Sequence, residues 1–153
     1  MIYSSWGKTI KTIKIPEPIK DFKVYTMTGS SLWAKLSTAG LSMPMGMLDN
    51  EYYYTDEAGW KVILGDLVQN SNLYVTDKYD CDKFAMKARV TAFERYALNT
   101  VGFVIGDIPQ GRHSFNLIVT TTGFLLFEPQ RDITNFGVFP LGGRSYHADV
   151  ILI

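Results

Sequence analysis

The pattern of apolar and polar positions is irregular in the first half of the chain and clear in the second half. In the first half, short strand-like or irregular segments cover residues 8–15, 22–27, 51–54, 60–64 and 72–75. Residues 32–36 fit the start of a short helix with Ser31 as its cap. These segments predict several short elements, and they do not fix how the elements pair.

The second half begins with the longest helical pattern in the chain. Apolar residues recur at helical spacing from Cys81 to Leu98, after Asp80 in the N-cap position. Most of that stripe is alanine, so the helix can approach a sheet closely. Strands are predicted after it at residues 101–105, 113–121, 124–127 and 148–153. The order predicts an α+β fold in which one long helix packs on an antiparallel sheet.

Size and charge narrow the classes of function. A chain of 153 residues fits a single domain over residues 1–153. Lys+Arg and Asp+Glu balance at 15 each, which argues against nucleic acid or an anionic membrane as partner. No signal peptide and no apolar run of about 18 residues stands out, so a cytoplasmic location is the default expectation.

The one cysteine supplies the candidate chemistry. Cys81 opens the predicted helix, His113 lies on a strand, and Glu128 follows on the next strand. This is the order of a papain-like or transglutaminase-like catalytic triad, in which a histidine ionises the thiol and an acid orients the histidine. The alternative interpretation is that each residue is structural, because a lone cysteine on an alanine-rich helix face is usually a small core residue.

Hairpin geometry links the histidine to the acid. If the turn centres on residues 121–122, His113 pairs with Gln130, and Glu128 lies on the adjacent diagonal of the same face. Either side chain then reaches the imidazole. A three-residue loop would instead turn both away from it.

Three short segments, residues 79–85, 113–116 and 127–130, resemble the C-terminal domain of fungal chimerolectins of the Marasmius oreades agglutinin type. That domain is a papain-like cysteine protease activated by calcium or manganese. The resemblance implies a papain-like/transglutaminase-like fold with a catalytic core at about residues 72–130. It does not extend to the sugar-binding part of those proteins, for which the chain has no room.

The resemblance also implies roles for individual residues. Cys81 would be the nucleophile, His113 the acid and base, and Glu128 the orienting acid. Papain-like enzymes place a glutamine a few residues before the cysteine to bind the oxyanion. This chain has none there, and Gln69 and Asn72 are the nearest candidates.

Two aspartates flank the cysteine and oppose its ionisation. Asp80 and Asp82 would raise the pKa of the thiol by like-charge repulsion. A calcium ion on them, helped by Gln130, would cancel that effect and switch the thiol on. The alternative is that Asp80 is a helix cap and Asp82 a favourable first-turn charge, with no metal required.

Two functions from different classes follow. The first is a cysteine hydrolase, a peptidase or amidase acting on a peptide or protein, with calcium as an optional activator. The second is a non-enzymatic binding or structural module that keeps the fold, such as a phage or bacterial accessory protein. A neutral charge and the missing upstream glutamine fit the second.

Overall fold

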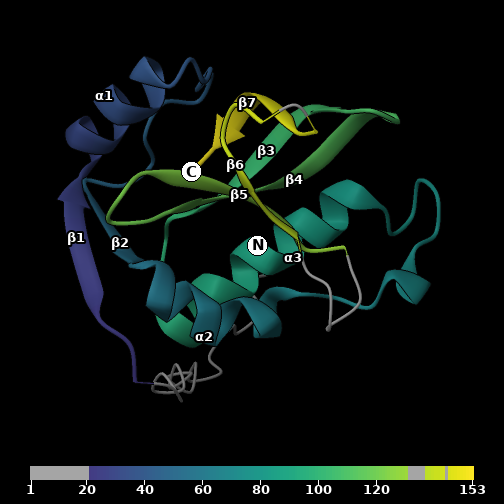
Figure 1. The fold of residues 1–153 in the computed structure, drawn as a ribbon, viewed down its shortest axis with the longest axis horizontal. Coiled ribbons are helices and arrows are strands. Elements are labelled where there is room, and N and C mark those ends of the chain that lie inside the picture. The colour runs from purple at the N-terminus through teal and green to yellow at the C-terminus, as the bar shows by residue number, and fades with distance from the viewer. Residues whose placement is uncertain (1–20, 131–136, 144) are drawn as a thin grey trace, which may run out of the picture.

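The computed structural model describes residues 21–130, 137–143 and 145–153, which form two antiparallel sheets and three α-helices. In chain order the elements are β1 (Val24–Thr28), α1 (Gly29–Thr38), β2 (Glu51–Thr55), α2 (Glu57–Leu67), the 3-10 turn η1 (Ser71–Leu73), α3 (Cys81–Tyr96), β3 (Val101–Ile108), β4 (Gly111–Val119), β5 (Phe124–Glu128), β6 (Gly137–Pro140) and β7 (His147–Leu152). Strands β1 and β2 form one sheet, and the other has the order β6-β5-β4-β3-β7. Helix α1 lies on one side of the larger sheet, and α2 and α3 lie on the other (Figure 1).

The alternation of residues along β4 separates two hydrophobic cores. Phe115 and Leu117 belong to the core that α1 covers, whereas Ile118 belongs to the core under α2 and α3. Successive side chains of a strand point to opposite faces, so odd positions of β4 face α1 and even positions face α3. Any side chain on β4 is therefore assigned to one side of the sheet by its number alone.

Helix α3 packs on the even face of β4, as its alanine stripe predicts. Ala85, Ala88 and Ala92 are fully buried, which leaves room for the helix to lie close to the strands. The side-chain amide of Asn116 donates to the backbone oxygens of Ala85 and Gly102, at 3.0 Å each. The Asn116 side chain therefore links α3 to the sheet.

The prediction of a strand-like segment at residues 60–64 is wrong, because the segment lies inside helix α2. Asp56 caps that helix by accepting from the backbone N–H of Gly59 at 2.8 Å. The buried residues recur at helical spacing, at positions 60, 63, 64 and 67. Gly59 is required there, since a Cβ atom would lie 1.9 Å from Thr55 Oγ1.

The predicted architecture, one long helix on a sheet in a papain-like/transglutaminase-like core, is wrong. Instead of a papain-like/transglutaminase-like core with one long helix on a sheet, a five-stranded antiparallel sheet is covered by helices on both faces. The prediction failed because α2 has the composition of a strand and because no strand was predicted from the sequence at β6. The predicted strand at residues 8–15 lies outside the described residues. No helix within the described ranges is both long and apolar enough to span a bilayer.

Candidate functional site

His113 and Glu128 form a partly buried pair on the α1 side of the sheet. The register of β4 and β5 pairs Asn116 with Phe127, which is the register of a turn centred on residues 121–122. It brings His113 Nε2 to 2.7 Å from Glu128 Oε2. Glu128 is only 4% exposed, so its carboxylate depends on partners within the protein.

Two further groups hold the Glu128 carboxylate. The Tyr146 hydroxyl donates to Oε2 at 3.2 Å, and the backbone N–H of Gln130 donates to Oε1 at 2.9 Å. Tyr146 itself packs edge-on against Phe115 in the core that α1 covers. The imidazole therefore contacts a carboxylate that is itself held from two directions.

The three amide side chains proposed to orient groups or bind an oxyanion have other surroundings. Gln69 uses both ends of its amide, donating to Phe84 O at 3.2 Å and accepting from the Tyr79 hydroxyl at 2.6 Å. Asn72 is exposed in η1. The side-chain oxygen of Gln130 is buried without a hydrogen-bond partner among the described residues. Gln130 thus supports Glu128 through its backbone rather than through its side chain.

Cys81 begins α3, the helix that packs on the face of the sheet opposite His113. Its side chain is partly buried, and it makes no hydrogen bond to any residue within the described ranges. His113 takes the odd, α1-facing parity on β4, whereas Asn116, which contacts α3, takes the even parity. The pair His113–Glu128 is formed, and the catalytic roles given to Cys81, His113 and Glu128 stay predictions.

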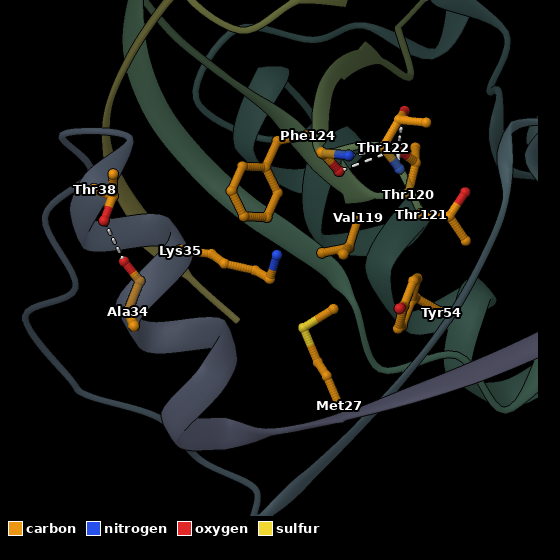
Figure 2. A pocket seen from close by; sticks show the side chains of 11 residues that line it. Met27, Ala34, Lys35, Thr38, Tyr54, Val119, Thr120, Thr121, Thr122 and Phe124 are labelled. Atoms are coloured by element: carbon orange, nitrogen blue, oxygen red, sulfur yellow. Dashed lines mark hydrogen bonds between the residues drawn. The ribbon is translucent and has the colours of Figure 1, made fainter.

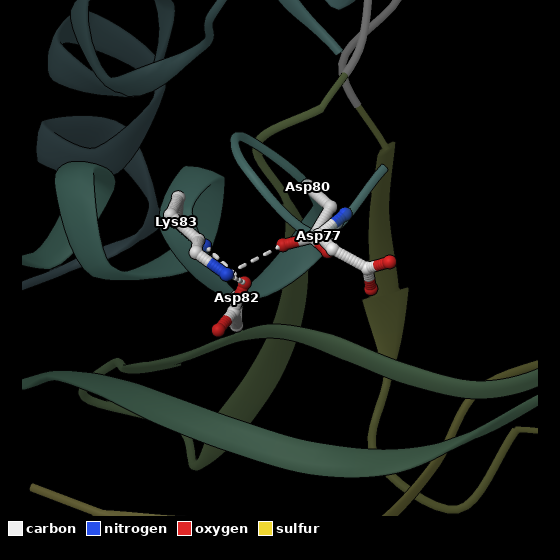
Figure 3. A network of polar contacts seen from close by, with 4 residues as sticks. All are labelled: Asp77, Asp80, Asp82 and Lys83. Atoms are coloured by element: carbon white, nitrogen blue, oxygen red, sulfur yellow. Dashed lines mark hydrogen bonds and ion pairs between the residues drawn. The ribbon is translucent and has the colours of Figure 1, made fainter. Parts of the chain in front are cut away.

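The aspartates beside Cys81 are engaged by a lysine (Figure 3). Lys83 Nζ lies 3.0 Å from Asp80 Oδ1 and 2.9 Å from Asp82 Oδ1. Asp80 also accepts from the backbone N–H of Asp77 at 3.0 Å, and its side chain does not cap the helix. Hydrogen bonds with Asp82 and Lys83 lower the pKa of Asp80 to about 2.

Lys83 therefore supplies the positive charge that the sequence argument assigned to a cation. The described residues contain no group of three or more metal-ligating side chains. Calcium on Asp80 and Asp82 remains a prediction, and an ion binding there would have to displace an ammonium group from both carboxylates.

A pocket that sequence reasoning missed lies between α1, the two-stranded sheet and the β4–β5 turn (Figure 2). Its volume is about 400 Å³, within the range of small-molecule sites. The lining residues are Met27, Ala34, Lys35, Thr38, Tyr54, Val119, Thr120, Thr121, Thr122, Gly123 and Phe124. These residues come from segments up to about a hundred positions apart in the sequence, so no local sequence motif predicts the pocket.

Hydrogen bonding within the pocket wall leaves some polar groups available. Thr120 Oγ1 is saturated by the turn, where it accepts from the backbone N–H groups of Thr122 and Gly123. The side chains of Lys35, Tyr54 and Thr121 make no hydrogen bond or ion pair to a residue in the described part of the chain. The pocket thus offers one ammonium group and two hydroxyl groups beside the ring of Phe124.

Fold and pocket together define a small α+β module with a lateral ligand-sized pocket, and solved structures contain a comparable fold. The chain matches a structure described as the PSL1a-E64 complex, with a TM-score of 0.61 and 20% identity, over 84% of this chain and 51% of that one. It also matches Polyporus squamosus lectin bound to the human-type influenza-binding epitope Neu5Acα2-6Galβ1-4GlcNAc, with a TM-score of 0.53 and 20% identity, over 84% of this chain and 49% of that one. No family model and no curated protein matches.

These matches correct the family and function predicted from the sequence. Both structures are complexes of a lectin from Polyporus squamosus, and neither description names a protease, a hydrolase or calcium. The assignment to a papain-like thiol protease, and with it the cysteine peptidase or amidase function, is replaced by a fold shared with part of a lectin. The chain spans about half the length of each matched structure.

Proposed function

We propose that this chain is a non-enzymatic binding module whose ligand is a carbohydrate, held in the pocket between α1 and the β4–β5 turn. The observation that carries the proposal is the convergence of an aromatic ring, two uncommitted hydroxyl groups and an ammonium group in about 400 Å³. Likeness to a lectin fold supports the ligand class. A saccharide takes the place of the peptide or protein substrate expected from the sequence.

The pocket lining offers an aromatic ring and hydroxyl groups, which complement the apolar C–H face and the hydroxyl groups of a sugar. Phe124 is half-buried and turns a ring toward the pocket, which suits the apolar C–H face of a pyranose (Figure 2). Tyr54 is fixed by stacking on Tyr25, with ring centroids 5.6 Å apart. Its hydroxyl and that of Thr121 can exchange hydrogen bonds with sugar hydroxyls, because a hydroxyl both donates and accepts.

The pocket is also largely preformed. Hydrogen bonds of Thr120 close the β4–β5 turn, and Thr122 Oγ1 donates to Glu57 Oε1 at 2.9 Å, which fastens the turn to α2. On the opposite wall, the Thr28 hydroxyl caps α1 by accepting from the Ser31 N–H. A preformed site lowers the entropy lost when a ligand binds.

The test is a saccharide titration followed by isothermal calorimetry or by ligand-observed NMR. The panel contains Neu5Acα2-6Galβ1-4GlcNAc, its separate monosaccharides and glucose. In the variant Ala34→Trp, an indole would fill the pocket from α1, where Ala34 is exposed. The matched control is Met86→Trp, at an exposed position of α3 on the other face of the sheet.

Binding of a saccharide by the natural chain and by Met86→Trp, with loss in Ala34→Trp, is the expected result. Equal binding by both variants would remove the ligand from this pocket. Absence of binding to every member of the panel would reject the carbohydrate as ligand class.

A second measurement addresses the non-enzymatic half of the proposal. The chain is incubated with the thiol-directed reagent E64, the ligand of one matched structure, and its intact mass is recorded with and without calcium. An unchanged mass is expected. Stoichiometric modification of Cys81 that disappears in His113→Ala would overturn the non-enzymatic assignment, and it would support the predicted catalytic roles of both residues.

A further inference from the structure

Lys35 is placed differently from an ordinary surface lysine. It belongs to the last turn of α1, and its side chain extends into the middle of the pocket between Phe124, Val119 and Met27 (Figure 2). Within the described ranges, no carboxylate lies within 4.0 Å of its ammonium group. The cation is thus aimed at space that a ligand would occupy.

The charge around the pocket is one-sided. Its lining contains Lys35 and no aspartate or glutamate. One carboxylate is hydrogen-bonded to a lining residue: Glu57 Oε1 accepts from the Thr122 hydroxyl at 2.9 Å. A ligand entering the pocket meets one positive charge whose partner the described chain does not supply.

We infer that the pocket selects a saccharide that carries a carboxylate, such as a sialic or uronic acid, and that Lys35 is the residue that binds this group. The inference rests on the proposed function and specifies its ligand class. The carboxylate forms a charge-assisted hydrogen bond with the Lys35 ammonium group, and the ring of the sugar lies against Phe124. Thr121 and Tyr54 remain available to the sugar hydroxyls.

A lysine in the last helical turn also has a structural explanation. It interacts favourably with the carbonyl groups at the end of α1, where no other basic residue lies in the last turn. That role affects helix stability and is indifferent to the charge of a ligand. Comparing an acidic sugar with its neutral ester therefore separates the two explanations.

The experiment titrates the chain with the methyl glycoside of N-acetylneuraminic acid and with the methyl ester of the same compound, at low and high salt. The free acid is expected to bind about fivefold more tightly at low salt, the difference produced by about 1 kcal/mol from one exposed ion pair. The preference should shrink at high salt because ions screen exposed charges. It should vanish in Lys35→Met, persist in Lys35→Arg, and persist in Lys87→Met, an exposed control on α3.

The outcomes distinguish this inference from the proposed function. Equal binding of acid and ester by the natural chain overturns the inference and leaves carbohydrate binding intact. A preference for the acid that survives in Lys35→Met overturns the role of Lys35. Failure of the chain to bind any saccharide rejects the proposed function, and the inference falls with it.

Discussion

Glu128 gives the sharpest test of how the fold is held together. We predict that Glu128→Gln lowers the free energy of unfolding by about 2–3 kcal/mol and that Glu128→Ala lowers it by about 3–5 kcal/mol. The carboxylate is 4% exposed and accepts hydrogen bonds from the Tyr146 hydroxyl and the Gln130 N–H, beside the His113 ring at 2.7 Å. A buried acceptor with this many partners leaves several of them unsatisfied when it is removed.

The two substitutions differ because glutamine keeps part of this network. Its oxygen can still accept from the Gln130 N–H, and its amide group can donate to His113 if the imidazole changes tautomer. The Tyr146 hydroxyl would then have to turn its own lone pair toward the amide. Alanine offers none of these contacts, so the full desolvation penalty of the abandoned partners remains.

The assay is urea denaturation followed by tryptophan fluorescence, with Glu94→Gln, an exposed site on α3, as the matched control. For a chain of this size the loss in Glu128→Gln corresponds to a fall in Tm of roughly 5–10 °C. A double-mutant cycle with His113→Ala isolates the coupling between the two residues. A change of less than 0.5 kcal/mol in Glu128→Gln, on the scale of ~0.5 kcal/mol typical of surface sites, would refute this account of the pair.

Three further predictions concern local packing and charge. Gly59→Ala should destabilise the chain by about 1–3 kcal/mol, because the new Cβ would lie 1.9 Å from Thr55 Oγ1. Gly65→Ala should stabilise it by about 0.5–1 kcal/mol, because no atom lies within 4 Å of the new Cβ. Changes in Tm of the same sign in the two variants would contradict this pair of predictions. The pKa of Asp80 is lowered from 3.8 to about 2, so its stabilising effect is complete above about pH 4 and is lost as the pH falls through 2. The difference in Tm between the natural chain and Asp80→Asn should therefore shrink between pH 5 and pH 2. A difference that stays constant over this range would contradict the stabilising role of Asp80. Burial, and then a hydrogen bond to a neighbouring aspartate, raise the pKa of Tyr96 to about 12, so Tyr96→Phe should remove one tyrosine ionisation near pH 12 from an ultraviolet titration.

Sequence patterns predict some elements of this chain correctly and others wrongly. The helix from Cys81 follows from its spacing of alanines, and the β4–β5 register follows from a two-residue turn at residues 121–122. Both are local features, in which the relevant atoms are close in sequence. Helix α2 was missed because Trp60 and its β-branched neighbours favour a strand, while the capping bond from the Gly59 N–H to Asp56 stabilises a helix.

The candidate site likewise combines contacts that the sequence predicts with contacts that only the structure reveals. For a two-residue turn, hairpin parity places Glu128 and Gln130 on the face of His113, and the structure shows that Glu128 makes the contact. It gives no sign that Lys83 neutralises both aspartates beside Cys81, although the spacing of residues 80 and 83 permits the contact. Family motifs of a few residues led to a protease, whereas the comparison over 84% of the chain led to a fold shared with part of a lectin structure, because short segments carry little information about the complete fold.

By itself, the sequence determined the elements whose signals are local: the alanine-striped helix, strands β3, β4, β5 and β7, and, for a two-residue turn, the shared face of His113, Glu128 and Gln130. Only the tertiary structure decided which face of the sheet each residue occupies and which distant segments meet. The pocket depends on that decision, because Lys35 on α1 and Phe124 on β5 become neighbours only when α1 packs across the sheet. Periodicity records whether a side chain is buried, but the partner that buries it is set by packing between elements far apart in the chain.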